Sequence, residues 1–152
     1  MAINPNTTFI AGAILTAAQM NRLPFGVVQY SGTVASQAVT TITDLTGLSA
    51  TWTAIASRTY VIQAFATAYS SVGGDSIGLA IATSAGATVA IGHAVSNTNA
   101  VAVAINVAYK VTPSAGSVTY KLRGQRSGTG TATYQPDGLT PSFILVTDLG
   151  PA

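Results

Sequence analysis

The chain contains one histidine, His93, the residue type that most often acts as a general base near neutral pH. A Ser–His–Asp arrangement would need one of the four aspartates, Asp44, Asp75, Asp137 or Asp148, beside it, and no G-x-S-x-G nucleophile motif occurs. We therefore interpret His93 as structural. The alternative is a zinc site in which three copies of His93 meet on a three-fold axis, since zinc accepts three imidazoles.

The acidic and glycine-rich segments contain no pattern for metal or phosphate chemistry. The aspartates are widely spaced, no D-x-D-x-D calcium motif is present, and the chain has no Glu. Residues 124–130 superficially resemble a phosphate-binding loop, but the lysine after the last glycine is missing and no helical pattern follows. We therefore expect a loop here, no catalytic residue, no metal ion and no cofactor. The alternative in which the chain is an enzyme is a cell-wall hydrolase.

Basic side chains are few and partly clustered. Lys121, Arg123 and Arg126 are half of the six Lys and Arg residues, and the simplest interpretation is a solvated strand face. The alternative is a contact with an acidic partner surface. A net charge of +2 is too small to indicate binding to nucleic acid. No apolar run approaches the ~18 residues of a membrane span, so we expect no membrane insertion.

Four aromatic residues, Tyr30, Trp52, Tyr69 and Tyr134, could form a sugar-stacking platform on the surface. Aromatic residues in β-proteins are more often core residues or cross-strand pairs. A glycan- or receptor-binding module therefore stays open as an alternative function.

The composition indicates a chain whose outer surface is partly covered. Only 7% of its 152 residues are charged, against about 25% in ordinary globular proteins, while 48% are hydrophobic. A folded monomer would carry about one charge per 700 Å² of surface, which is poor for colloidal solubility. We therefore expect a homo-oligomer. The absence of Cys excludes disulfides and thiolate metal sites.

The elements that position these residues are predicted by their periodicity. Alternating apolar and polar residues separated by turn clusters run from Val27 to the end, which predicts one all-β antiparallel sandwich over residues 26–152. We expect strands over residues 27–30, 39–43, 50–55, 59–69, 76–83, 88–93, 100–111, 117–126, 131–134 and 141–149, and a turn over residues 44–47.

Residues 1–25 differ from this pattern and predict an N-terminal arm. Thr16 and Gln19 have capping-box spacing, and Pro24 would end the helix, so we expect one short helix of about two turns. Residues 9–18 are apolar enough for a signal-peptide core, but no Lys or Arg precedes them. We therefore expect synthesis in the cytoplasm.

Two strands have an apolar residue on both faces. In residues 100–111, Ile105 and Val107 alternate with small residues, and residues 143–146 are large and apolar on both faces. A strand that is apolar on both faces is covered on both, and a two-layer sandwich covers only one. We therefore predict an oligomer interface that contains Ala102, Ala104, Ala108, Phe143 and Leu145.

Two segments resemble structural proteins of tailed phages, particularly phages of actinobacteria. The segment FIAGAILTAAQMN followed by LPFGVV (residues 9–28) resembles an N-terminal segment common in their virion proteins, and PSFILVTDLGPA (residues 141–152) is similar to their closing strand. Between them, the order of strands resembles the jelly-roll heads of the C1q/TNF type, which associate as trimers.

This resemblance implies a jelly-roll sandwich in a trimeric virion protein, assembled in the host cytoplasm. It implies a minor tail or tail-fibre component ahead of a capsid decoration, and it brings no catalytic residue. Other virion proteins and the host cell surface would be the partners. The N-terminal segment would be the attachment arm, with Leu15, Met20, Leu23 and Phe25 as its apolar contacts.

Overall fold

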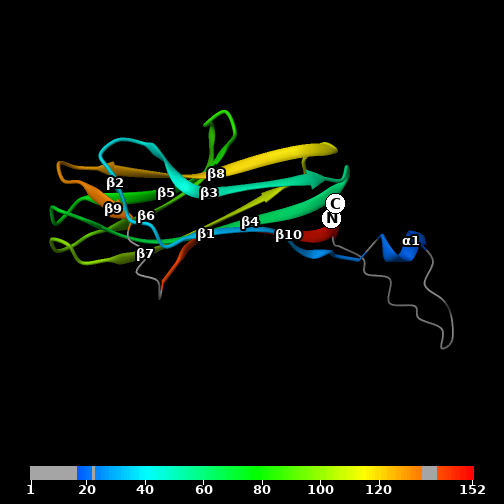
Figure 1. Ribbon diagram of the computed structural model, residues 1–152, viewed down its shortest axis with the longest axis horizontal. Coiled ribbons are helices and arrows are strands. Elements are labelled where there is room, and N and C mark those ends of the chain that lie inside the picture. Colours follow the sequence, from blue (N-terminus) through cyan, green and yellow to red (C-terminus); the bar gives the residue numbers. More distant parts are fainter. Residues whose placement is uncertain (1–16, 22, 135–139) are drawn as a thin grey trace.

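The computed structural model describes residues 17–21, 23–134 and 140–152, which form two antiparallel sheets packed face to face (Figure 1). This confirms the all-β sandwich predicted by the alternating pattern. The strands are β1 (Gly26–Thr33), β2 (Gln37–Val39), β3 (Thr43–Ala54), β4 (Arg58–Ser70), β5 (Ser76–Thr83), β6 (Thr88–Val95), β7 (Val103–Val111), β8 (Gly116–Ser127), β9 (Ala132–Tyr134) and β10 (Ser142–Pro151).

The two sheets differ in their strand order. The first, which we call the β4 sheet, has the order β1-β10-β4-β9-β2, and β7 also pairs with β4. The second, the β5 sheet, has the order β3-β8-β5-β6. Consecutive strands such as β3 and β4 therefore lie in different layers.

The core lies between the two sheets and consists of every second side chain of each strand. Ile62 and Ile144 from the β4 sheet, and Leu79 and Leu122 from the β5 sheet, are fully buried. Complete burial of a side chain of this size contributes about 1.5–3 kcal/mol. Trp52 packs against Tyr60 and Tyr120 with ring-centroid distances of 5.5 and 5.8 Å. The inward-facing residues predicted by strand alternation are thus the residues that hold the sheets together.

The turn predicted over residues 44–47 is wrong, because β3 continues through these residues. The register of β3 against β8 shifts between Asp44 and Ser49, where β3 carries more residues than its partner. Gly47 has a positive φ of 77° within this irregular stretch, and both Leu45 and Leu48 are buried. A bulge allows two leucines three positions apart to reach the same core, which regular alternation would not allow.

Two other predicted strands have different bounds. The segment predicted over residues 39–43 is the end of β2 and the first residue of β3, with residues 40–42 between them. The strand predicted from residue 100 begins at Val103, so Ala102 lies just outside β7. Ala100 has a φ of 59°, which is incompatible with an extended strand.

In its described residues the N-terminal segment contains one helical turn, α1 (Ala17–Met20), whereas about two turns were expected. Its predicted N-cap, Thr16, lies outside the described residues, so the capping box stays a prediction. The division into residues 1–25 and 26–152 also stays a prediction, although β1 begins at Gly26. Among the described residues, no helix has the length and apolar character needed to cross a membrane.

Candidate functional site

The outer face of the β4 sheet is largely apolar. Residues that lie opposite one another on neighbouring strands form rows across this face. Tyr30 of β1 lies opposite Leu145 of β10, which lies opposite Gln63 of β4, which in turn lies opposite Ala108 of β7. Tyr30 is 54% exposed, although its side chain is large and mostly apolar. This row therefore presents three largely apolar side chains and one amide away from the core, across four adjacent strands.

The next row contains an aromatic cluster. Phe143 lies opposite Gly32 on one side and Phe65 on the other, and Phe65 lies opposite Asn106. The Phe143 ring is 5.8 Å from that of Phe65 and 6.0 Å from that of Tyr30. Because these rings pack on the outside of the sandwich, they form a pre-arranged apolar surface and do not belong to the core.

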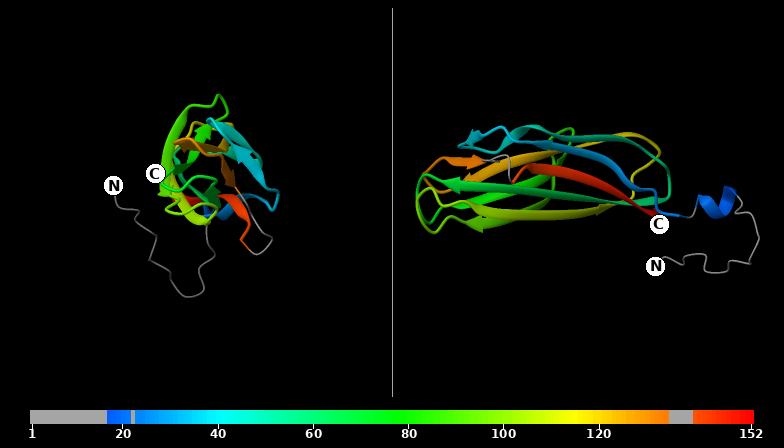
Figure 2. Two further views of the ribbon diagram at one scale, coloured as in Figure 1. Left: turned by 90° about the vertical axis from the view of Figure 1, so that its left-hand side faces the viewer. Right: turned by 60° about the horizontal axis from the view of Figure 1, so that its bottom comes forward.

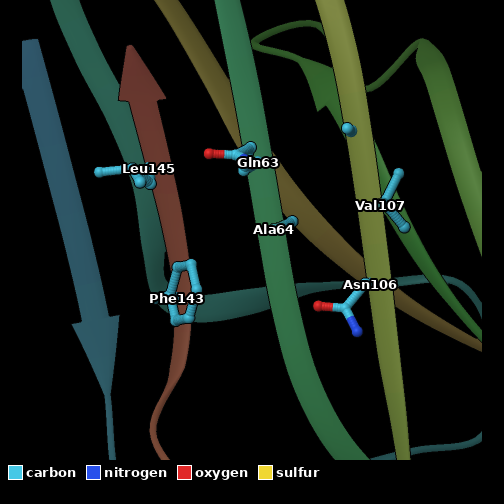
Figure 3. A pocket seen from close by; sticks show the side chains of 7 residues that line it. Gln63, Ala64, Asn106, Val107, Phe143 and Leu145 are labelled. Carbon is cyan, nitrogen blue, oxygen red and sulfur yellow. The ribbon is translucent and has the colours of Figure 1, made fainter. Parts of the chain in front are cut away.

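A shallow hollow of about 330 Å³ lies in this face, between β10 and β7 (Figure 3). Phe143 and Leu145 border it on the β10 side, while Gln63 and Asn106 contribute two amides from β4 and β7. The hollow exists because Ala108 is small where its neighbours in the rows are large. Such a hollow can accept a side chain from a partner surface.

The structure brings most of the predicted interface residues together on this face. Phe143 and Leu145 are half-buried, whereas Ala104 and Ala108 on β7 are exposed. Ala102 is also exposed but precedes the strand. The interface itself stays a prediction.

On the opposite side of the sandwich, the outer face of the β5 sheet is polar along β3 and β8. Thr51 and Thr119 share a hydrogen bond of 2.8 Å, and the carboxylate of Asp44 is 2.6 Å from Lys121 Nζ and 2.9 Å from Arg123 Nε. The hydrogen bond from Lys121 is the main reason that the pKa of Asp44 lies below its usual value. The predicted basic cluster is therefore not one solvated face. Asp44 of the same subunit partly neutralises Lys121 and Arg123, whereas Arg126 lies opposite the buried Ile77 and donates to the Thr40 carbonyl over 3.1 Å.

A buried ion pair joins the N-terminal segment to the sandwich. Arg58 at the start of β4 donates from Nε and Nη2 to the two carboxylate oxygens of Asp148 on β10, each over 2.7 Å. The same guanidinium donates to the backbone carbonyls of Asn21 (2.5 Å) and Leu23 (2.7 Å). The ring of Phe25 lies over it, with its centroid 3.9 Å from Arg58 Cζ.

Hydrogen bonding keeps both members of this pair charged. Burial would by itself raise the pKa of Asp148, but hydrogen bonds from Arg58 and from the Gly150 and Phe25 N–H groups outweigh it and hold the pKa below its usual value. The hydrogen bond to Asp148 correspondingly raises the pKa of Arg58. At neutral pH both groups are thus charged, and the remaining N–H donors of Arg58 bind the arm.

The predicted arm contacts are only partly described. Leu15 lies outside the described residues, while Met20, Leu23 and Phe25 are 50%, 39% and 50% exposed. In its described residues the segment is held by two backbone carbonyls and by the Phe25 ring, all bound to Arg58, and sequence reasoning missed the role of Arg58. An arginine at the start of an otherwise apolar strand was the available signal. Figure 2 shows α1 at the end of the sandwich where β10 ends.

Asp75 organises the loops at the end of the sandwich opposite to α1. Its carboxylate accepts hydrogen bonds from Ser70 Oγ (2.7 Å), Gly130 N (2.8 Å) and Thr129 N (3.2 Å). The Ser70 hydrogen bond is the first cause of a pKa below the usual value, with burial opposing it. The glycine-rich run predicted as a loop is thus the end of β8 followed by a loop fastened to Asp75.

His93 is exposed on β6, opposite Gly78 on β5. Within the described ranges, no group of three or more His, Cys, Asp or Glu residues is placed to hold a metal ion. Because β6 belongs to the β5 sheet, His93 lies away from the apolar face of the β4 sheet.

The sugar-stacking platform considered for Tyr30, Trp52, Tyr69 and Tyr134 is wrong as a single surface. Trp52 and Tyr134 are buried in the core, and the Tyr134 hydroxyl donates to the Gly78 carbonyl. Tyr30 is exposed but packs with the aromatic cluster of the apolar face.

Comparison with solved structures identifies the fold. Eiger TNF from S. frugiperda aligns with a TM-score of 0.52 and 14% identity, over 86% of this chain and 96% of that one. The fold is a TNF-like jelly roll. No protein-family model matches the chain, and neither does any curated protein.

Two weaker structural similarities were also found. A chain of infectious bursal disease virus, Gx strain, aligns with a TM-score of 0.40 and 16% identity, over 86% of this chain and 36% of that one. The MgGH51 α-L-arabinofuranosidase aligns with a TM-score of 0.38 and 10% identity, over 86% of this chain and 24% of that one. At TM-scores below 0.5, neither bears on the function of this chain.

Proposed function

We propose that this chain is a non-enzymatic structural protein of a tailed-bacteriophage particle and that it works as a homotrimer. The apolar outer face of the β4 sheet is the observation that carries the proposal. Its two central rows contain aromatic, aliphatic and amide side chains and no charged residue; Lys110 belongs to the next row. The resemblance of residues 9–28 to phage virion proteins supports the location in the particle.

The size of this face fits a subunit interface. Strands about 4.8 Å apart and a rise of about 3.3 Å per residue give the β1-β10-β4-β7 face a projected area of roughly 500 Å². A stable complex of standard size buries about 800 Å² on each partner, so this face would supply more than half of one contact. The chain's low content of charged residues also agrees with a surface that is covered in use.

A cyclic trimer joins two different patches of each subunit. Apart from the β4 sheet, exposed large apolar side chains lie along β6 and in the turn before β7. Ile91, Val95 and Val101 are 40%, 48% and 53% exposed, and Ala102 follows Val101. We propose that the apolar faces of the three copies meet around the three-fold axis, where the same residues of each copy come together, and that this edge is the second patch that packs against the next copy.

The N-terminal segment would attach the trimer to the particle. Met20, Leu23 and Phe25 are exposed apolar residues at one end of the sandwich, beside the exposed Ile55. We favour a tail component over a capsid decoration, following the sequence resemblance. Recognition of the host surface by loops at the opposite end is the remaining alternative.

Two measurements test this proposal. Light scattering should give about three times the 15.3 kDa mass of one chain, and a monodisperse monomer would contradict the interface. Quantitative mass spectrometry of purified particles should detect a few copies in multiples of three for a tail component. An abundance close to that of the major capsid protein would favour a decoration, and absence from particles would contradict the virion role.

A further inference from the structure

Two amide side chains occupy the middle of the apolar face. Gln63 and Asn106 lie on neighbouring strands, in adjacent rows of the β4–β7 ladder, and both face the hollow bordered by Phe143 and Leu145 (Figure 3). Both residues are exposed, and within the described part of the chain neither side-chain amide has a hydrogen-bond partner. In an isolated subunit, water satisfies these groups.

Covering this face would remove that water. A buried amide without a partner is strongly unfavourable, so any surface that packs over this face must offer hydrogen bonds at these two positions. An occupant that is apolar throughout does not fit.

An amide can satisfy another copy of itself. The side chains of Gln and Asn each carry two N–H donors and an accepting carbonyl oxygen, whereas a carboxylate or an ammonium group would repel its own copy. Residues close to the axis of a cyclic oligomer meet their own symmetry copies. The two amides can therefore bind the same amides of another copy. This favours further copies of this chain as the partner that covers the face.

We propose that Gln63 and Asn106 pair with the amides of neighbouring copies and thereby determine the register and copy number of the oligomer. This inference rests on the proposed homotrimer and deepens it. The apolar rings supply the affinity of the contact. The amides make every arrangement that leaves them unpaired less stable, as single buried polar residues do in other oligomers. The two amides are thus specificity-determining residues.

The first test replaces both amides by leucine, in the full-length double variant Gln63→Leu/Asn106→Leu, with native mass spectrometry as the measurement. We expect the variant still to associate but to form a mixture of oligomers in place of one species. Thr53→Leu, which changes an exposed polar residue of β3 in the other sheet, is the control and should leave one species. A double variant that forms only the wild-type oligomer would overturn the inference.

The second test introduces a charge with almost no change in shape. Gln63→Glu should raise the dissociation constant roughly tenfold or more at pH 7, because like charges then meet at the interface. Acidification below about pH 4 should restore the oligomer, since a protonated carboxyl again carries both a donor and an acceptor. Thr51→Glu on the polar face is the control, and an unchanged Gln63→Glu oligomer at pH 7 would contradict the inference.

The failure of this inference can be distinguished from failure of the proposed trimer. Ala108→Arg places a large charge in the same face without removing any packing, since Ala108 is exposed. If Ala108→Arg leaves the oligomer intact, this face is not the interface and both proposals fail. If Ala108→Arg dissociates the oligomer but the Gln63 and Asn106 variants behave as wild type, only the role of the amides is wrong.

Discussion

Arg58 and Asp148 form a buried bidentate ion pair across β4 and β10, with both N–O distances at 2.7 Å. The side chains are only 4% and 0% exposed. The remaining donors of the guanidinium bind two carbonyls of the N-terminal segment. The subunit therefore holds the base of its own arm, with no second chain required.

Asp148→Asn should both destabilise the sandwich and release the base of the arm. The substitution leaves the Arg58 guanidinium buried without a counter-charge, which should lower the free energy of unfolding by roughly 3 kcal/mol. Urea denaturation measures this loss, and hydrogen exchange at the Leu23 and Phe25 amides should accelerate. Asp44→Asn, in the exposed pair with Lys121, should cost no more than about 1 kcal/mol. Equal costs for the two variants would contradict a structural role for the buried pair.

Stability should decline at acidic pH. The folded-state pKa values of Asp148 and Asp75 lie below the ordinary value, so these carboxylates stabilise the fold above the unfolded pKa of about 3.9. That stabilisation is lost as the pH falls through the lower folded pKa values. The urea midpoint should therefore be nearly constant from about pH 5 to about pH 9 and fall below about pH 4. In Asp148→Asn, the acid decline should be shallower.

Gly128→Ala should be more destabilising than Gly116→Ala. The two glycines have similar positive φ values of 134° and 125°, so both substitutions impose backbone strain of about 1–2 kcal/mol. An added Cβ at Gly116 meets open space, whereas one at Gly128 would lie 1.8 Å from Asp75 Oδ1. The difference in free energy of unfolding between the two variants therefore measures the fit of the loop around Asp75. Equal losses would contradict this fit.

Ala108→Arg should convert the proposed trimer into a folded monomer. The substitution places a guanidinium in the hollow of the apolar face, and burying that charge without a partner at an interface costs several kcal/mol. Light scattering measures the mass, and an unchanged circular dichroism spectrum and melting temperature establish that the subunit stays folded. Thr51→Arg, on the opposite outer face, should remain trimeric.

Strand alternation predicted which side of each strand faces the core, and this held at several positions. Val107 is buried while Ala108 is exposed, and Leu122 is fully buried between the half-buried Lys121 and Arg123. The prediction is local because side chains of successive strand residues point in opposite directions. It failed at residues 44–47, where a bulge keeps Leu45 and Leu48 in the same core despite turn-like residues.

Only part of the candidate site could be predicted from the sequence. Residues 143–146 are apolar on both sides of the strand, which indicated that another surface covers their outer side. Phe143 and Leu145 do lie on the apolar face. Neither Gln63 nor Tyr30 could be assigned to that surface, because their place depends on the β1-β10-β4-β7 pairing. The Arg58–Asp148 pair was missed for the same reason, since it joins residues 90 positions apart.

The sequence by itself determined the β-class, the in-and-out alternation of the strands and the scarcity of charge, because these properties depend only on residue type and on spacing along the chain. Tertiary structure decided which strands are neighbours. It thereby gathered Tyr30, Phe65 and Phe143 into one aromatic cluster and brought Arg58 to Asp148. The physical reason is that register and strand order depend on packing of the whole core, and no local pattern contains that information.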